Sequence, residues 1–185
     1  MLILIGRSGS GKDTVAKELQ RRGWNRIVTD TTRKMRKSET EGVEYNFISR
    51  EEFEERKKYN YYIDVKCFTL SDCSKVFYGV PELGEGLDKS FLVLPPSSFL
   101  QLGLKAFSVY IYANNATIKK RLLERGDPKD EVERRMKADS KDFWGLVNHV
   151  DKIAYNNMGE NIENVVDKIE GWYNKYDSSG MVRER

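Results

Sequence analysis

The sequence has little of several residue types on which common site chemistries depend. Its 185 residues include two cysteines and one histidine. Cys67 and Cys73 have neither metal-binding nor C-x-x-C spacing, so they predict no zinc site and no disulfide framework. Two such cysteines favour a reducing, cytoplasmic location. The histidine, His149, stands in no partner motif, and we expect a surface or structural role for it.

Long hydrophobic runs and a strong charge excess are also absent. The apolar start at residues 2–5 ends at Gly6 and is too short for a signal sequence or a membrane span. The formal net charge is +3, from 32 basic and 29 acidic residues, which does not indicate a general nucleic-acid binder. The sequence therefore predicts a soluble protein without membrane or nucleic-acid partners.

Short apolar runs alternate with helical patterns along the chain. Residues 2–5, 91–94 and 109–112 read as buried parallel strands, and residues 152–155 as a last strand. Helical spacing follows the first run, and Ile118, Leu122 and Leu123 predict one apolar helix face after the third. This alternation favours an α/β fold with a parallel sheet flanked by helices. Further expected elements are helices at 50–58, 129–138 and 162–172, and strands at 61–68 and 76–78.

A glycine-rich segment directly after the first strand carries the clearest chemical signal. Gly6 to Lys12 matches G-x-x-x-x-G-K and opens a helix, which is the context of a phosphate-binding P-loop. Glycines let the backbone curve around an anion, and the helix N-terminus faces the phosphates of ATP. Lys12 reaches the β- and γ-phosphates. The predicted ATP-binding residues are Gly6, Arg7, Ser8, Gly9, Ser10, Gly11, Lys12, Asp13 and Thr14.

One position departs from the P-loop pattern. The motif normally ends in a serine or threonine that binds Mg²⁺, whereas Asp13 follows Lys12 here and Thr14 comes next. Asp13 is either a Mg²⁺ ligand or an acidic residue favoured by the helix dipole. We expect Asp13 or Thr14 to hold the metal.

The next segment resembles the guanylate kinase family. Residues 31–36 contain T-T-R-x-x-R, and residues 42–47 contain G-x-x-Y-x-F, followed by S-x-x-E-F at 49–53. The resemblance extends over nearly the whole chain apart from the tail. It implies transfer of the ATP γ-phosphoryl group to a nucleoside monophosphate, with GMP the leading acceptor and Mg²⁺ required. Carried over by motif, Thr29, Arg33, Arg36, Tyr45 and Tyr78 would bind the acceptor phosphate, where guanidinium groups suit its oxygens.

The base-reading residue departs from the family. Asp64 falls where the family has an acidic residue, usually glutamate, that accepts hydrogen bonds from guanine. The family's serine or threonine after Tyr-Gly is Val80 here, and the acidic element expected near residues 94–96 is missing. A different or deoxy nucleoside monophosphate therefore stays open as the acceptor. A non-catalytic binding module is a further alternative, which the intact P-loop disfavours.

Three arginines match the lid of the family. Arg121, Arg125 and Arg135 would neutralise charge during phosphoryl transfer together with Lys12, and no general base is needed. We expect one domain, divided into a core, an acceptor-binding insertion, a lid and a tail. The predicted core is residues 1–29, 90–124 and 137–176, the insertion 30–89, the lid 125–136 and the tail 177–185. Oligomeric state is not predicted.

Overall fold

The protein is described by a computed structural model that covers residues 1–37, 39–70 and 73–179. The chain divides into two compact units. The first, called the core unit, consists of Met1–Asn25 and Asp88–Arg185, and the second, called the insertion unit, is Arg26–Leu87. The last six residues of the predicted tail lie outside the described residues. The functional division into core, insertion and lid stays a prediction.

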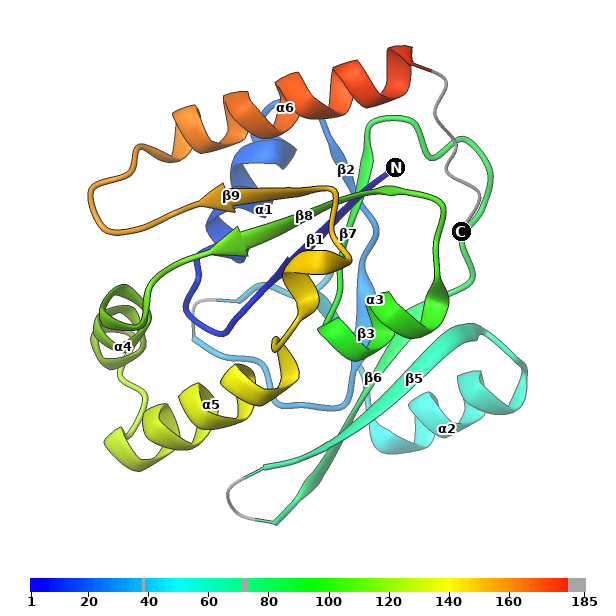
Figure 1. Ribbon diagram of the computed structural model, residues 1–185. Helices are drawn as coiled ribbons and strands as arrows, with labels where there is room; N and C mark the ends of the chain where they lie inside the picture. Colours follow the sequence, from blue (N-terminus) through cyan, green and yellow to red (C-terminus); the bar gives the residue numbers. More distant parts are fainter. Residues whose placement is uncertain (38, 71–72, 180–185) are drawn as a thin grey trace. The chain divides into compact units, whose positions relative to one another are not determined.

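A five-stranded sheet with the order β2-β7-β1-β8-β9 forms the centre of the core unit (Figure 1). β1 is parallel to both β7 and β8, and β8 is parallel to β9. The central position of β1 explains why all five of its residues are buried. The strands are β1 (Leu2–Gly6), β2 (Asn25–Arg26), β7 (Ser90–Val93), β8 (Phe107–Tyr112) and β9 (Lys152–Tyr155).

Helices α1 and α6 pack together against one face of this sheet. Their apolar residues recur at helical spacing, and Val15, Leu19, Val166 and Ile169 join Leu4 in the main hydrophobic core. A smaller cluster holds α4 against α5. The helices are α1 (Lys12–Arg21), α3 (Pro96–Leu102), α4 (Asn115–Glu124), α5 (Lys129–Asp142), the short η1 (Leu146–Asn148) and α6 (Ile162–Ser178).

Two local expectations about helices were wrong or incomplete, and helix α3 was not predicted. The first residue of α3 is Pro96, at a position that needs no N–H donor and suits the fixed φ of proline. Leu123 does not share the buried face of α4, because its side chain is 37% exposed while Leu122 is buried. Helix α5 continues four residues past Ala138, to Asp142.

The insertion unit is built on a four-stranded sheet with the order β4-β3-β6-β5. Its centre is Asp30, fully buried, which accepts hydrogen bonds from Asn46, Arg56 and Tyr62. Burial and the bond to Asp30 raise the pKa of Tyr62. This cluster joins strand to helix inside the unit. Its elements are β3 (Thr29–Thr31), β4 (Tyr45–Phe47), α2 (Arg50–Lys58), β5 (Tyr62–Thr69) and β6 (Lys75–Pro81).

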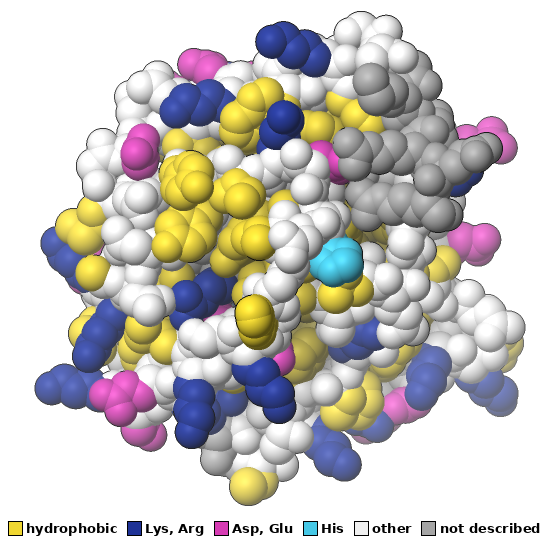
Figure 2. All heavy atoms as spheres, viewed as in Figure 1, with side chains coloured by type: hydrophobic (Ala, Val, Ile, Leu, Met, Phe, Trp, Pro, Cys, Tyr) yellow, Lys and Arg dark blue, Asp and Glu magenta, His cyan; other side chains and the backbone are white. Residues whose placement is uncertain are grey.

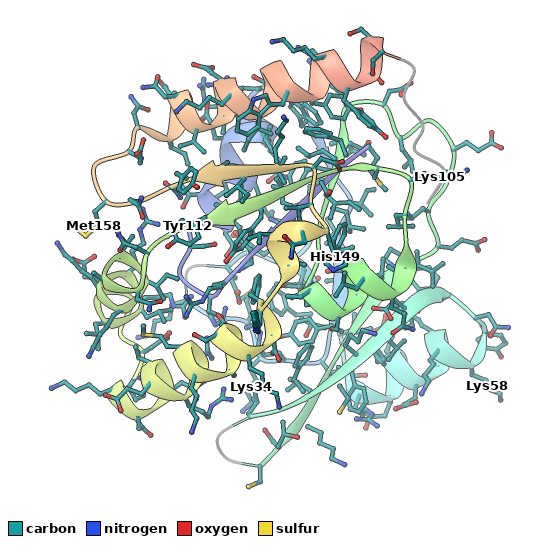
Figure 3. All side chains as sticks on the ribbon, in the orientation of Figure 1. Lys34, Lys58, Lys105, Tyr112, His149 and Met158 are labelled. Atoms are coloured by element: carbon teal, nitrogen blue, oxygen red, sulfur yellow. The ribbon has the colours of Figure 1, made fainter. Side chains whose placement is uncertain are left out.

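No helix among the described residues is long and apolar enough to cross a membrane. His149 ends the short η1 turn and is exposed, as Figures 2 and 3 show. Its position agrees with the expected surface role.

Candidate functional site

The P-loop of the core unit connects β1 to α1. Gly9 and Gly11 have φ angles of 77° and 87°, which a residue with a side chain rarely adopts. Gly11 is the N-cap of α1, so the turn ends where the helix exposes its first N–H groups. The Ser10 N–H donates to the Arg7 carbonyl at 3.0 Å and closes the loop. The geometry is that of an anion-binding helix N-terminus.

Close packing behind the loop explains why Gly11 must lack a side chain. A Cβ atom at this position would lie 2.2 Å from Nδ2 of Asn156. That amide donates to the Ser10 carbonyl at 2.9 Å, directly after β9 ends. Asn156, at the end of the last strand, therefore fixes the backbone of the loop through its side chain.

Arg121 of α4 supports the same carbonyl. Its Nη1 donates to the carbonyl oxygens of Ser10, at 3.1 Å, and of Asn156, at 3.0 Å. Burial lowers the pKa of the Arg121 guanidinium. The predicted lid arginine thus contacts the P-loop backbone in this structure, which places a positive charge beside the predicted phosphate site.

Arg7 connects the P-loop to two helices. Its side chain is 9% exposed and donates to Asn115 Oδ1 at 2.7 Å, at the start of α4. It also donates to the Met136 carbonyl and to Ser140 Oγ, both in α5. The Ser8 N–H donates to Asp139 Oδ2 at 2.7 Å. The guanidinium of Arg7 makes these hydrogen bonds within the core unit. The predicted contact of Arg7 with ATP would therefore involve its backbone atoms.

The other two lid arginines are paired with carboxylates near the start of α5. Arg125 contacts Asp127, and Arg135 Nε donates to Glu131 Oε1 at 2.5 Å. Arg135 Nη1 also lies 3.9 Å from Asp127. Hydrogen bonds from Arg134 and Arg135 lower the pKa of Glu131 to about 2. These carboxylates hold the two guanidinium groups close together, and all four residues belong to the core unit.

Asp13 and Thr14 lie in the first turn of α1, next to Lys12, and both are exposed. A carboxylate and a hydroxyl at this position are oxygen donors of the kind that Mg²⁺ prefers. Such an ion commonly takes one or two protein ligands and fills its other positions with substrate phosphates and water. The donor set fits the metal, and its role stays a prediction.

In the insertion unit, Arg33 forms a bidentate pair with Glu39. The two N–O distances are 3.0 and 2.8 Å, and both side chains are less than 10% exposed. Burial opposes the charged forms, yet the pairing raises the pKa of Arg33 and lowers that of Glu39. Glu39 also accepts from the Arg36 backbone at 2.8 Å and from its guanidinium at 3.3 Å. A carboxylate thus joins the two arginines predicted to bind a phosphate.

Aromatic hydroxyl groups adjoin these arginines. Arg33 Nε donates to Tyr78 Oη at 3.1 Å, and the Arg33 guanidinium lies 5.5 Å from the centre of the Tyr45 ring. The Tyr45 and Tyr78 rings are in contact, with centroids 5.6 Å apart. Thr29, buried in β3, is the register partner of Tyr45 in β4. The fold therefore brings Arg33, Arg36, Tyr45 and Tyr78 into one cluster, with Thr29 on the neighbouring strand.

Asp64 lies on β5 of the same unit and is 5% exposed. Both of its carboxylate oxygens are buried, and neither accepts a hydrogen bond from the described residues. Its charge is balanced by Lys66, whose Nζ lies 3.0 Å from Oδ1. Asp64 pairs with Val80 across the ladder. A buried carboxylate with hydrogen-bonding capacity to spare is suited to a ligand with N–H donors.

Sequence analysis missed four residues that shape these sites: Glu39, Lys66, Asp139 and Asn156. None belongs to a motif that was used, and the contacts of Asp139 and Asn156 join segments more than 100 positions apart. Glu39 and Lys66 lie within three residues of predicted site residues in the sequence. Their charge, opposite to that of the nearby site residue, was the signal that could have indicated a pairing.

Comparison with known proteins gives consistent matches. A family model described as guanylate kinase matches residues 1–172. The guanylate kinase of Clostridium tetani is 30% identical, over 92% of this chain and 83% of its own length. That of Bacillus cereus is 31% identical, over 86% and 82% respectively. A crystal structure of guanylate kinase from Anaplasma phagocytophilum matches 98% of this chain and 86% of that one, with a TM-score of 0.67 and 25% identity.

Proposed function

Since the chain belongs to the guanylate kinase family, we propose that it transfers the γ-phosphoryl group of ATP to GMP, forming ADP and GDP. The observation that carries the proposal is the P-loop geometry at Gly6–Lys12, with Gly11 capping α1 and Lys12 at its first position. A non-catalytic module has no need for such a loop, whereas a kinase depends on it. The arginine and tyrosine cluster of the insertion unit supplies a second, separate anion site.

Each unit has a distinct task in this proposal. In the core unit, the loop N–H groups and Lys12 bind the phosphates of ATP, and Arg121, Arg125 and Arg135 offset the charge that develops during transfer. Asp13 and Thr14 would hold Mg²⁺, which draws charge from the phosphate oxygens when bound. The acceptor phosphate is already an anionic nucleophile, so the reaction requires no protein base.

In the insertion unit, Arg33 and Arg36 bind the acceptor phosphate. In the structure, both guanidinium groups donate hydrogen bonds to the Glu39 carboxylate. Phosphate oxygens favour the same N–H groups as a carboxylate does. The Tyr45 and Tyr78 hydroxyl groups add donors, and Thr29 lies beside them. Asp64 accepts hydrogen bonds from the base. The reaction requires the acceptor phosphate to come in line with the γ-phosphate of ATP.

The test is an assay of ADP formation from ATP and Mg²⁺ with a panel of ribo- and deoxynucleoside monophosphates. We expect GMP or dGMP to give the highest kcat/KM. Val80, which places no hydrogen-bonding group opposite Asp64, favours a second candidate, a kinase for a nucleoside monophosphate with another base. Preference for a different acceptor would establish that candidate, and binding of ATP without turnover of any monophosphate would refute both.

Lys12→Met provides the matched control for this assay. The substitution removes the P-loop cation and keeps the aliphatic stem, so kcat is expected to fall about 100- to 1,000-fold. Thermal unfolding in the absence of nucleotide should change little. Retained turnover in this variant would show that the measured activity does not use the P-loop.

The proposed partners are the small-molecule nucleotides. Cys67 and Cys73 are both free and exposed, which supports the proposal of a reducing, cytoplasmic location.

A further inference from the structure

The surroundings of Asp64 contain a second charged group that the sequence motifs do not explain. Lys66 is two residues further along β5, and its side chain is 17% exposed. Its Nζ lies 3.0 Å from Oδ1 of Asp64, whose side chain is 2% exposed. A lysine that folds back onto a nearly buried carboxylate holds its ammonium group at a fixed position within the site.

The ladder of β5 and β6 shows which residues share this face. Asp64 is opposite Val80 and Lys66 is opposite Tyr78, so these four side chains lie on the same side of the sheet. Tyr78 accepts the hydrogen bond from Arg33, in the predicted phosphate site. The register breaks between Tyr62 and Asp64, a local irregularity that sets the direction of the residues after it. Base and phosphate sites therefore adjoin along one sheet face.

Guanine needs more than a carboxylate for recognition. Its hydrogen-bonding edge carries two donors, N1–H and the N2 amine, and one acceptor, O6. The two oxygens of Asp64 match the two donors. Val80 is 5% exposed and has no donor for O6. Lys66, on the same face, provides a hydrogen-bond donor next to Asp64 in its ammonium group.

We propose that Lys66 is a specificity-determining residue that donates a hydrogen bond to O6 of the guanine base while Asp64 accepts from N1–H and N2–H. This inference rests on the proposed function and names the group that selects the acceptor. Adenine carries an amine in place of O6 and an acceptor at N1. In the same position it sets a donor against the ammonium and an acceptor against the carboxylate, and such mismatches reject a ligand strongly.

The test compares Lys66→Met with the unmodified enzyme on two acceptors: GMP and 6-thioguanosine monophosphate, which keeps N1–H and the N2 amine but has sulfur, a weaker hydrogen-bond acceptor, in place of O6. We expect kcat/KM for GMP to fall about 10- to 100-fold, the range for a lost hydrogen bond to a charged group. Activity with the analogue should change less than about 3-fold, because its sulfur accepts only a weak hydrogen bond from the ammonium group. The ratio of the two activities separates recognition of O6 from any general effect on Asp64.

Two further variants sharpen the result. Lys75→Met removes an exposed lysine at the far end of the same hairpin and should leave both acceptors unaffected. Val80→Thr introduces a hydroxyl donor opposite Asp64, and combined with Lys66→Met it should restore part of the GMP activity. Equal losses on GMP and the analogue, or no loss on GMP, would overturn the inference.

Calorimetric binding of GMP alone distinguishes failure of this inference from failure of the proposed function. If GMP binds but is not phosphorylated, the proposed function fails, and the effect of Lys66→Met on the Kd still decides the role of Lys66. A Kd that Lys66→Met raises about 10- to 100-fold would support the inference. An unchanged Kd, or no binding of GMP to the unmodified enzyme, would overturn it.

Discussion

Replacing Arg33 by methionine should reduce both stability and acceptor binding, for separable reasons. Arg33 and Glu39 form a bidentate pair in which each side chain is less than 10% exposed. Breaking a buried pair by removing one partner costs about 3–5 kcal/mol. Glu39 keeps its two contacts with Arg36, so we expect the lower end, about 3 kcal/mol. For a chain of this length that corresponds to a fall in Tm of roughly 6–12 °C.

The double variant Arg33→Met with Glu39→Met separates the two effects. Replacing both partners by apolar groups removes the isolated carboxylate, so the free energy of unfolding should return to within about 1 kcal/mol of its original value. Acceptor binding should not return, because the guanidinium proposed to bind the phosphate is still missing. The measurements are thermal unfolding without nucleotide and KM for GMP at saturating ATP. A double variant as unstable as the single one, or one with an unchanged KM, would refute the reasoning.

Two further predictions concern the core unit. Asn156→Ala removes the amide that supports the Ser10 carbonyl, and should cost about 1 kcal/mol of stability and reduce the thermal shift produced by ATP; an undiminished shift would show that the loop does not depend on this bond. The lowered pKa of Glu131 means that its contribution to stability is full above its ordinary value near 4.5 and is lost as pH falls towards about 2. Glu131→Gln should therefore lower Tm at pH 7 and leave less acid sensitivity over that window, measured by unfolding at a series of pH values; parallel curves for both proteins would contradict this.

Predictions from periodicity succeeded where local signals agreed with burial. The α/β fold class and the family are confirmed. The helix at Arg50–Lys58 and the strand at Lys152–Tyr155 have the expected bounds. The P-loop was identifiable because strand, glycines and helix follow one another in the chain. Leu123 was wrongly predicted to be buried. In a short helix, a residue at the edge of the buried face fits the helical spacing as well as a residue within that face does.

The side-chain contacts around the sites were beyond the sequence for a physical reason. Arg7 stands inside the phosphate-binding motif and was therefore predicted to bind ATP, while its guanidinium donates hydrogen bonds to Asn115 and to Met136 of α5. The partners of the guanidinium are more than 100 positions away in the sequence, and only the fold brings them next to Arg7. Lys66 was missed because a lysine on a strand reads as a solvated side chain until its neighbour's burial is known.

The bonds of Arg7 also make nucleotide binding and the position of α5 thermodynamically reciprocal. One side chain joins the loop predicted to bind ATP to the helix that carries Arg135, and the Asp139 bond to Ser8 adds a second connection. If a shift of α5 changes the affinity for ATP by some factor, then ATP binding must change the equilibrium between the two α5 positions by the same factor. Mutations on α5 that never touch the nucleotide are thus able to tune its dissociation constant.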